Sequence, residues 1–175
     1  SSMSIASLLE RREKLLGPGN PLFYDNPLHV VRGAGVWLYD ADGRRYLDCY
    51  NNVPCVGHCH PHVVEAICRQ SGQLNTHTRY LHENILDYAE RLLGKFDASL
   101  NRLMLACTGS EANDLALRLA RFNSGGTGII CTNATYHGNT AAVTQLNSIF
   151  SPFEGYGRNI RMVPWPDSYR ALRDL

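Results

Sequence analysis

The sequence has little net charge and no long apolar run. Its 17 lysine and arginine residues against 16 aspartate and glutamate residues give a formal charge of +1 over 175 residues. This balance gives no reason to expect binding to nucleic acid or to an acidic membrane surface. No run approaches the roughly 18 apolar residues that a membrane-spanning helix needs. With 44% hydrophobic residues, the chain is expected to be a soluble globular protein with one real core.

The sequence also lacks the marks of a leader peptide and of a disulfide framework. The first residues have no basic segment followed by an apolar one, as a signal peptide would. Ser1 and Ser2 stand before Met3 and are interpreted as an addition made for expression. The cysteines show no paired close spacing, so we expect reduced thiols in a cytoplasmic protein. They are Cys49, Cys55, Cys59, Cys68, Cys107 and Cys131.

A cluster of cysteines and histidines between residues 55 and 62 raises the question of a zinc site. A closed zinc site uses four ligands, usually in two pairs on separate arms of the chain. Here all the candidates crowd into one turn and no second cluster exists, so we expect no metal. The favoured interpretation is a buried loop whose imidazoles hydrogen-bond to the backbone. The candidates are Cys55, His58, Cys59, His60 and His62.

The most informative stretch runs from residue 102 to residue 121. The apolar run 103–107 predicts a buried strand, and Thr108-Gly109-Ser110 then breaks the pattern. Apolar residues recur at helical spacing from residue 112 to residue 120, which predicts a helix. A helix that begins after a glycine turn offers free amides and a positive dipole end, which suit a phosphate. Such turns are also common in α/β proteins that bind nothing there, so an ordinary capped helix remains an alternative.

Before this stretch the sequence predicts one helix, a small sheet and two further helices. The capping box Ser7-x-x-Glu10 predicts an amphipathic helix that ends near Gly17. Short extended runs separated by turns predict a three-stranded antiparallel meander over residues 29–48. Pro61 suits the first position of a helix, and residues 83–96 have helical spacing.

From about residue 100 the pattern is strand, helix, strand, helix, strand. Further strands are predicted at 128–132 and 160–164, with a possible helix at 140–146 between them. This alternation is typical of a parallel sheet covered by helices, so the fold class is α/β. Ligands in such sheets bind beyond the carboxyl ends of the strands. The Gly109-Ser110 turn and residues 136–138 are both expected there.

Four segments, in order and at suitable spacing, resemble the class III aminotransferase family. Members of this family have fold type I and use pyridoxal 5′-phosphate (PLP). The resemblance covers the chain from about residue 22 to residue 164. It implies a small domain that includes residues 1–55 and a large PLP-binding α/β domain that begins at residue 56 and is incomplete at residue 175. The matching segments are residues 37–48, 57–61, 108–113 and 136–138.

Longer stretches, 51–84 and 112–121, resemble the phospho-lyase branch of that family. Phospho-lyases eliminate phosphate and ammonia from an amino-alcohol phosphate instead of exchanging an amino group. Two alternatives stay open. One is a true aminotransferase on the same scaffold, which acts on an amine or ω-amino acid with a keto acid. The other is a catalytically silent phosphate-binding or dimerisation module.

The resemblance also implies roles for individual residues around the cofactor. Gly109 and Ser110 would bind the PLP phosphate, with the Ser110 hydroxyl as an added donor. Tyr136 would stack on the pyridine ring and His137 would border it. The alternative for Tyr136 is a core aromatic at the end of a strand. The active site would lie at the interface of a homodimer, with no role for nucleic acid or membrane.

For the substrate, the resemblance implies Arg79, Asn52 and Tyr24. A lyase needs a cationic group for the departing phosphate, and Arg79 is the best candidate in this sequence. The alternative for Arg79 is a solvated surface arginine.

The family's Schiff-base lysine has no counterpart here. The sequence holds only Lys14 and Lys95, which are expected in the first helix and near the end of the 83–96 helix. The resemblance places that lysine, and the acid that holds the pyridine nitrogen, beyond Leu175. We therefore expect the sequence to be the N-terminal part of a chain more than twice as long, and to be inactive alone.

Overall fold

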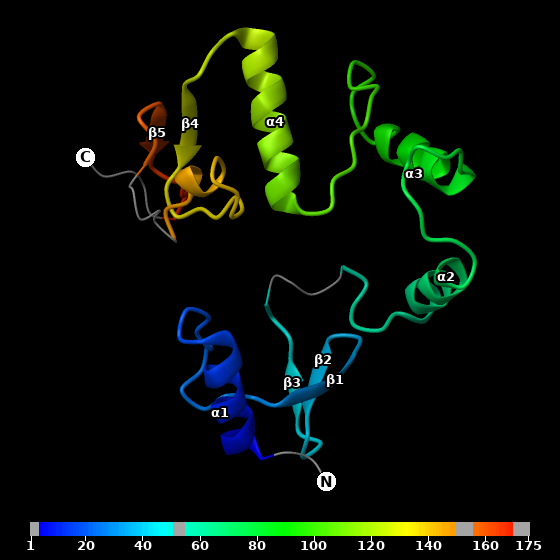
Figure 1. The fold of residues 1–175 in the computed structure, drawn as a ribbon, viewed down its shortest axis with the longest axis vertical. Coiled ribbons are helices and arrows are strands. Elements are labelled where there is room, and N and C mark those ends of the chain that lie inside the picture. The colour runs from blue at the N-terminus through cyan, green and yellow to red at the C-terminus, as the bar shows by residue number, and fades with distance from the viewer. Residues whose placement is uncertain (1–3, 51–54, 150–155, 170–175) are drawn as a thin grey trace. The chain divides into compact units, whose positions relative to one another are not determined.

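The structure, a computed structural model, describes residues 4–50, 55–149 and 156–169. The chain forms two compact units, Ser1–Leu81 and His82–Leu175, and each is described by itself (Figure 1). The domain boundary expected at residue 55 stays a prediction. None of the helices in the described ranges is long and apolar enough to cross a membrane.

The first unit begins with helix α1, Ile5–Leu16. Its N-cap is Ser4, whose Oγ accepts a hydrogen bond from the Ser7 amide at 3.2 Å. The expected start at Ser7 is therefore wrong by about one turn, because a serine three residues earlier has the extended backbone of a cap. The predicted end is confirmed: Gly17 follows the helix with φ +65° and donates to the Glu13 carbonyl.

The predicted meander is confirmed. Strands β1 (Val30–Ala34), β2 (Trp37–Asp40) and β3 (Arg45–Leu47) pair antiparallel in that order. The guanidinium of Arg32 lies 3.5 Å from the ring centre of Tyr39 on the neighbouring strand. Cross-strand pairs of this kind stabilise a small sheet that has little buried core.

Helices α2 and α3 follow the meander, α2 in the first unit and α3 in the second. Helix α2 spans Pro61–Ser71 and begins at its proline, as expected. Helix α3 spans Glu83–Leu93, and the His82 ring accepts a hydrogen bond from the Asn84 amide at 3.3 Å. Gly94 caps α3, so the helix ends before the expected Phe96. Lys95 accordingly lies just after α3, whereas Lys14 lies in the last turn of α1.

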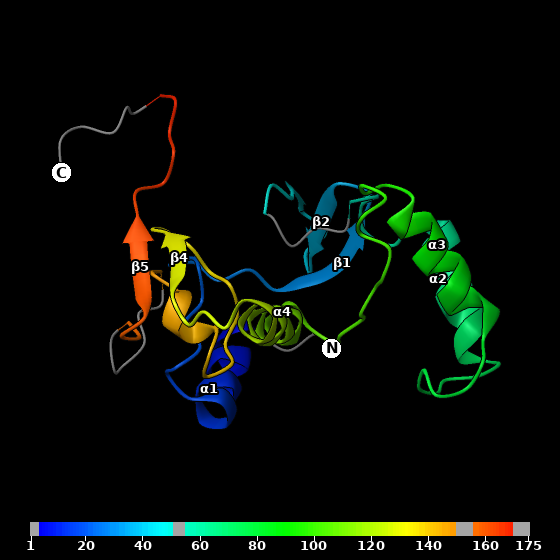
Figure 2. The same cartoon turned by 90° about the horizontal axis from the view of Figure 1, so that it is seen from above.

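The second unit also contains α4 (Gly109–Ser124), β4 (Ile129–Thr132) and β5 (Ile160–Val163). Strands β4 and β5 pair in parallel, and Figure 2 shows their arrows pointing the same way. The long connection between them contains a turn and a 3-10 helix, η1, at Thr144–Leu146. This short element stands where the sequence suggested a helix over 140–146.

The apolar run 103–107 forms no strand, and the expectation of a buried strand there is wrong. Met104 and Leu105 are 63% and 53% exposed. A strand needs a hydrogen-bonded neighbour, and no described residue pairs with this run. An apolar run in the sequence does not show whether a neighbouring strand is present to pair with it.

The buried side chains of the described residues all belong to the second unit. Four of them lie in the connection that follows β4, and the fifth begins β5 opposite the start of β4. Two of them are polar, so the most densely packed region of this unit has polar groups built into it. The buried side chains are Thr135, Val143, Leu146, Asn147 and Ile160.

Candidate functional site

The turn before α4 is held by reciprocal capping bonds. Thr108 is the N-cap, and its Oγ1 accepts a hydrogen bond from the Glu111 amide at 3.1 Å. The Oε2 atom of Glu111 accepts one from the Cys107 amide at 2.8 Å. The Glu111 carboxylate is thereby directed toward the chain that precedes the helix. The helix end is rigid, as an anion site requires.

The first two amides of α4, those of Gly109 and Ser110, remain open. Neither has a hydrogen-bond partner among the residues that the structure describes. A Cβ placed on Gly109 would meet no atom within 4 Å, so the turn faces open space. Two unpaired amides at the positive end of a 16-residue helix form a binding surface for an anionic group.

The Ser110 side chain connects this turn to the segment after β4. Its Oγ donates to Oδ1 of Asn139 and accepts from the Asn139 amide, each at 3.1 Å. Gly138 packs directly on Ser110: a Cβ there would lie 2.6 Å from Oγ and 2.7 Å from Cα. Gly138 also has φ +135°, so both the space and the backbone require glycine. The hydroxyl expected as a phosphate donor thus bonds to Asn139 in this structure.

Two asparagines hold the backbone of residues 137 and 138. Nδ2 of Asn113, on α4, donates to the His137 carbonyl at 2.7 Å. Asn147, from the connection that follows, accepts from the His137 amide and donates to the Gly138 carbonyl, each at 2.6 Å. Sequence reasoning missed both residues. Asn113 lies inside the family-like segment 108–113, whereas no local sequence pattern marks Asn147.

Tyr136 and His137 have different environments at this site. Tyr136 is 55% exposed, so the alternative of a core aromatic does not fit it. A ring in this state has area left for a flat ligand. His137 has its Nε2 atom buried, with no hydrogen-bond partner among the described residues. Buried polar atoms are normally paired, so a partner from outside the described residues is expected for this nitrogen.

The residues expected at the substrate end do not belong to the unit that contains this turn. Arg79 and Tyr24 belong to the first unit, and both are exposed. The Arg79 amide donates to Nδ1 of His77 at 3.2 Å. The His77 ring stacks on Tyr80 with centroids 5.0 Å apart. Asn52 lies outside the described residues.

The expectation of a buried loop at residues 55–62 is wrong. Most of its residues are exposed, and His58 hydrogen-bonds through Nε2 to Oδ2 of Asp48 at 2.8 Å rather than to the backbone. The pKa of Asp48 lies below its ordinary value of 3.8, chiefly because of this bond and next because of a hydrogen bond from the Tyr50 amide. Within the described ranges no group of three or more potential ligands could hold a metal ion.

Comparisons with known proteins identify relatives of this chain. The family described as aminotransferase class-III, whose members depend on PLP, matches residues 23–172. A Drosophila melanogaster protein named alanine–glyoxylate aminotransferase 2-like is 37% identical over 95% of this chain and 35% of its own length. The ethanolamine-phosphate phospho-lyase homolog 1 of Caenorhabditis elegans is 36% identical over 96% of this chain and 37% of its own length.

A solved structure is more similar still. The phospholyase from Arthrobacter, in complex with phosphoethanolamine, is 49% identical with a TM-score of 0.86, covering 91% of this chain and 38% of that one. The chain thus spans little more than a third of the proteins it matches. The family match covers most of the sequence, and the helices with antiparallel and parallel sheets agree with the α/β fold of the fold type I enzymes that this chain resembles. The chain belongs to the class-III aminotransferase family.

Proposed function

We propose that the turn at Gly109 and Ser110 holds the phosphate of PLP and that Tyr136 and His137 face its ring. The support is geometric. The two open amides suit a phosphate dianion. The hydrogen bonds between Ser110 and Asn139 hold the segment that carries the exposed Tyr136 beside that turn. The buried Nε2 of His137 has no partner among the described residues, and a bound cofactor could supply one.

When bound, PLP supplies an electron sink that stabilises negative charge at the carbon next to the substrate nitrogen. The residues of this chain would bind and orient it. The helix dipole and amides would fix the phosphate, the Tyr136 ring would cover one face, and His137 would limit movement of the ring. Lys14 belongs to α1 and Lys95 lies just after α3, so neither is part of the turn or of residues 136–139. We propose that the whole protein supplies the catalytic lysine from outside this sequence.

For the reaction, we propose elimination from an amino-alcohol phosphate. The substrate loses a proton at the carbon that bears nitrogen, the bond from the adjacent carbon to the phosphate oxygen breaks, and inorganic phosphate departs. Hydrolysis then gives an aldehyde and ammonia. The observation that carries this proposal is the 49% identity to a phospholyase in complex with phosphoethanolamine. We propose that Arg79 provides a cation for the departing phosphate.

Transamination is the second candidate, because a 37% identical relative carries an aminotransferase name. The whole protein should be assayed for phosphate and aldehyde released from ethanolamine phosphate, and for amino-group transfer to pyruvate. Release of phosphate and aldehyde in equal amounts supports elimination. Steady transfer with no phosphate release would instead establish an aminotransferase. Failure of both reactions in a PLP-loaded protein would favour a silent module.

We propose further that the whole protein is a cytoplasmic homodimer with the active site at its interface. The cytoplasmic part is supported by the cysteines, all of which are free. Sedimentation analysis tests the dimer, and a monomer that retains full activity would contradict it.

A further inference from the structure

Asn147 combines strong burial with a position directly beside the proposed cofactor segment. Its side chain is 1% exposed, and few other side chains of the described residues are buried. It follows η1 and lies against residues 137 and 138 from the side of the connection, not from α4. A buried carboxamide is costly unless both of its ends are paired, so its partners explain why it stands there.

Both ends of the carboxamide are used on the backbone of this one segment. Oδ1 accepts from the His137 amide and Nδ2 donates to the Gly138 carbonyl, each at 2.6 Å. A carboxamide offers one acceptor and one donor at the spacing of these two backbone groups, whereas an ionised aspartate has no donor. Neighbouring bonds extend the contact: the Thr135 amide donates to Ser148 Oγ at 2.8 Å, and the Ser148 amide returns a bond to the Thr135 carbonyl.

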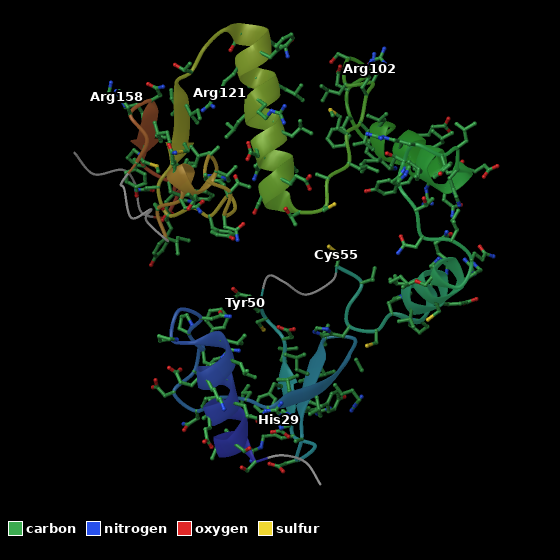
Figure 3. The ribbon with its side chains drawn as sticks, in the orientation of Figure 1. His29, Tyr50, Cys55, Arg102, Arg121 and Arg158 are labelled. Atoms are coloured by element: carbon green, nitrogen blue, oxygen red, sulfur yellow. The ribbon has the colours of Figure 1, made fainter. Side chains whose placement is uncertain are left out.

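The same segment is attached to α4 on its other side. Asn113 donates to the His137 carbonyl at 2.7 Å, and Ser110 is bonded to Asn139. Residues 136–139 are therefore held between the packed connection and the helix that carries the phosphate turn. The end of α4 that holds Ser110 is the one opposite Arg121, which is labelled in Figure 3.

We propose that Asn147 is a positioning residue for the cofactor: it fixes the backbone at His137 and Gly138 and so sets the orientation of Tyr136 toward the Gly109–Ser110 turn. This inference rests on the proposed PLP site and adds to it a residue that does not touch the cofactor. Without Asn147, the two buried backbone groups lose their partners and the segment no longer has a single conformation.

The test compares Asn147→Ala with Val143→Ala in the whole protein. Both substitutions truncate a fully buried side chain in the same connection, but only the first removes bonds to residues 137 and 138. Titration of the apoprotein should show PLP binding about tenfold weaker in Asn147→Ala, because the two bonds that fix residues 137 and 138 are lost. Its bound cofactor should also show a smaller induced circular dichroism band, which reports ring orientation. Val143→Ala should lose thermal stability yet bind PLP within about twofold of wild type.

Wild-type affinity and dichroism in Asn147→Ala would overturn the inference, as would equal losses in Val143→Ala. If Asn147→Ala does not fold, Asn113→Ala decides, since Asn113 is exposed and alanine suits a helix. It removes the bond to His137 from the other side and should also reduce affinity and dichroism; wild-type values there would overturn the positioning of this segment. A wild-type protein that binds no PLP would instead overturn the proposed function itself.

Discussion

Replacing Gly109 by valine should nearly abolish PLP binding and leave the fold intact. A Cβ at this position meets no atom of the protein within 4 Å, so the polypeptide accommodates the larger side chain. The same space is where a phosphate must approach the amides of Gly109 and Ser110. Loss of two hydrogen bonds to a charged acceptor costs about 3–6 kcal/mol, at about 1.5–3 kcal/mol each. That corresponds to an affinity more than a hundredfold lower.

The matched control is Gly128→Val. Gly128 directly precedes β4, and a Cβ there also meets nothing within 4 Å. Apoprotein of each variant is titrated with PLP, and thermal unfolding is followed in parallel. We expect Gly128→Val to bind like wild type. Wild-type affinity in Gly109→Val would refute the phosphate site, and equal losses in the two variants would show an effect on folding rather than on the turn.

Three further predictions concern neighbouring groups. Ser110→Ala removes two hydrogen bonds to the segment after β4 and should weaken PLP binding roughly tenfold, a smaller loss than in Gly109→Val. The same titration measures it, and a larger loss would mean that the hydroxyl itself binds phosphate. The His58 hydrogen bond lowers the pKa of Asp48 below 3.8 in the folded protein. This bond therefore stabilises the fold above about pH 4, and the stabilisation is lost as the pH falls through the lowered folded-state pKa. Urea unfolding across pH 2–6 should therefore show a weaker acid dependence in Asp48→Asn, and an unchanged dependence would exclude this pair as its source. If the Arg79 guanidinium pairs with the departing phosphate, Arg79→Ala should lower the rate of phosphate release by about two orders of magnitude and leave PLP affinity unchanged. The control is Arg69→Ala, since Arg69 is an exposed arginine in the same unit. Equal rates in the two variants would place the phosphate contact elsewhere.

The elements that local sequence determines were predicted well. The meander, the start of α2 at Pro61 and the helix after the glycine turn depend on turn residues, a fixed proline φ and apolar spacing, all of which are visible in a short window. The start of α1 was misplaced because two serines, three residues apart, both suit an N-cap. Only the backbone conformation at Ser4 decides between them.

The features that depend on distant residues could not be predicted from the sequence. Whether the run 103–107 is a buried strand depends on neighbouring strands, not on its own apolar residues. Asn147 gives no local signal, because its role arises only when the chain returns to residues 137 and 138. The Ser110 hydroxyl was expected to face a ligand, but Asn139 lies 29 residues later and accepts its hydrogen bond.

The most direct measurement of the phosphate site is whether the whole protein retains PLP through the Gly109–Ser110 turn. Purified protein is incubated with PLP, passed through gel filtration, and its visible absorbance is compared with that of Gly109→Val and Gly128→Val treated in the same way. We expect a stoichiometric protein-bound chromophore in wild type and Gly128→Val and almost none in Gly109→Val. A wild-type protein with no bound chromophore, or a Gly109→Val protein that retains it fully, would contradict a phosphate site at this turn.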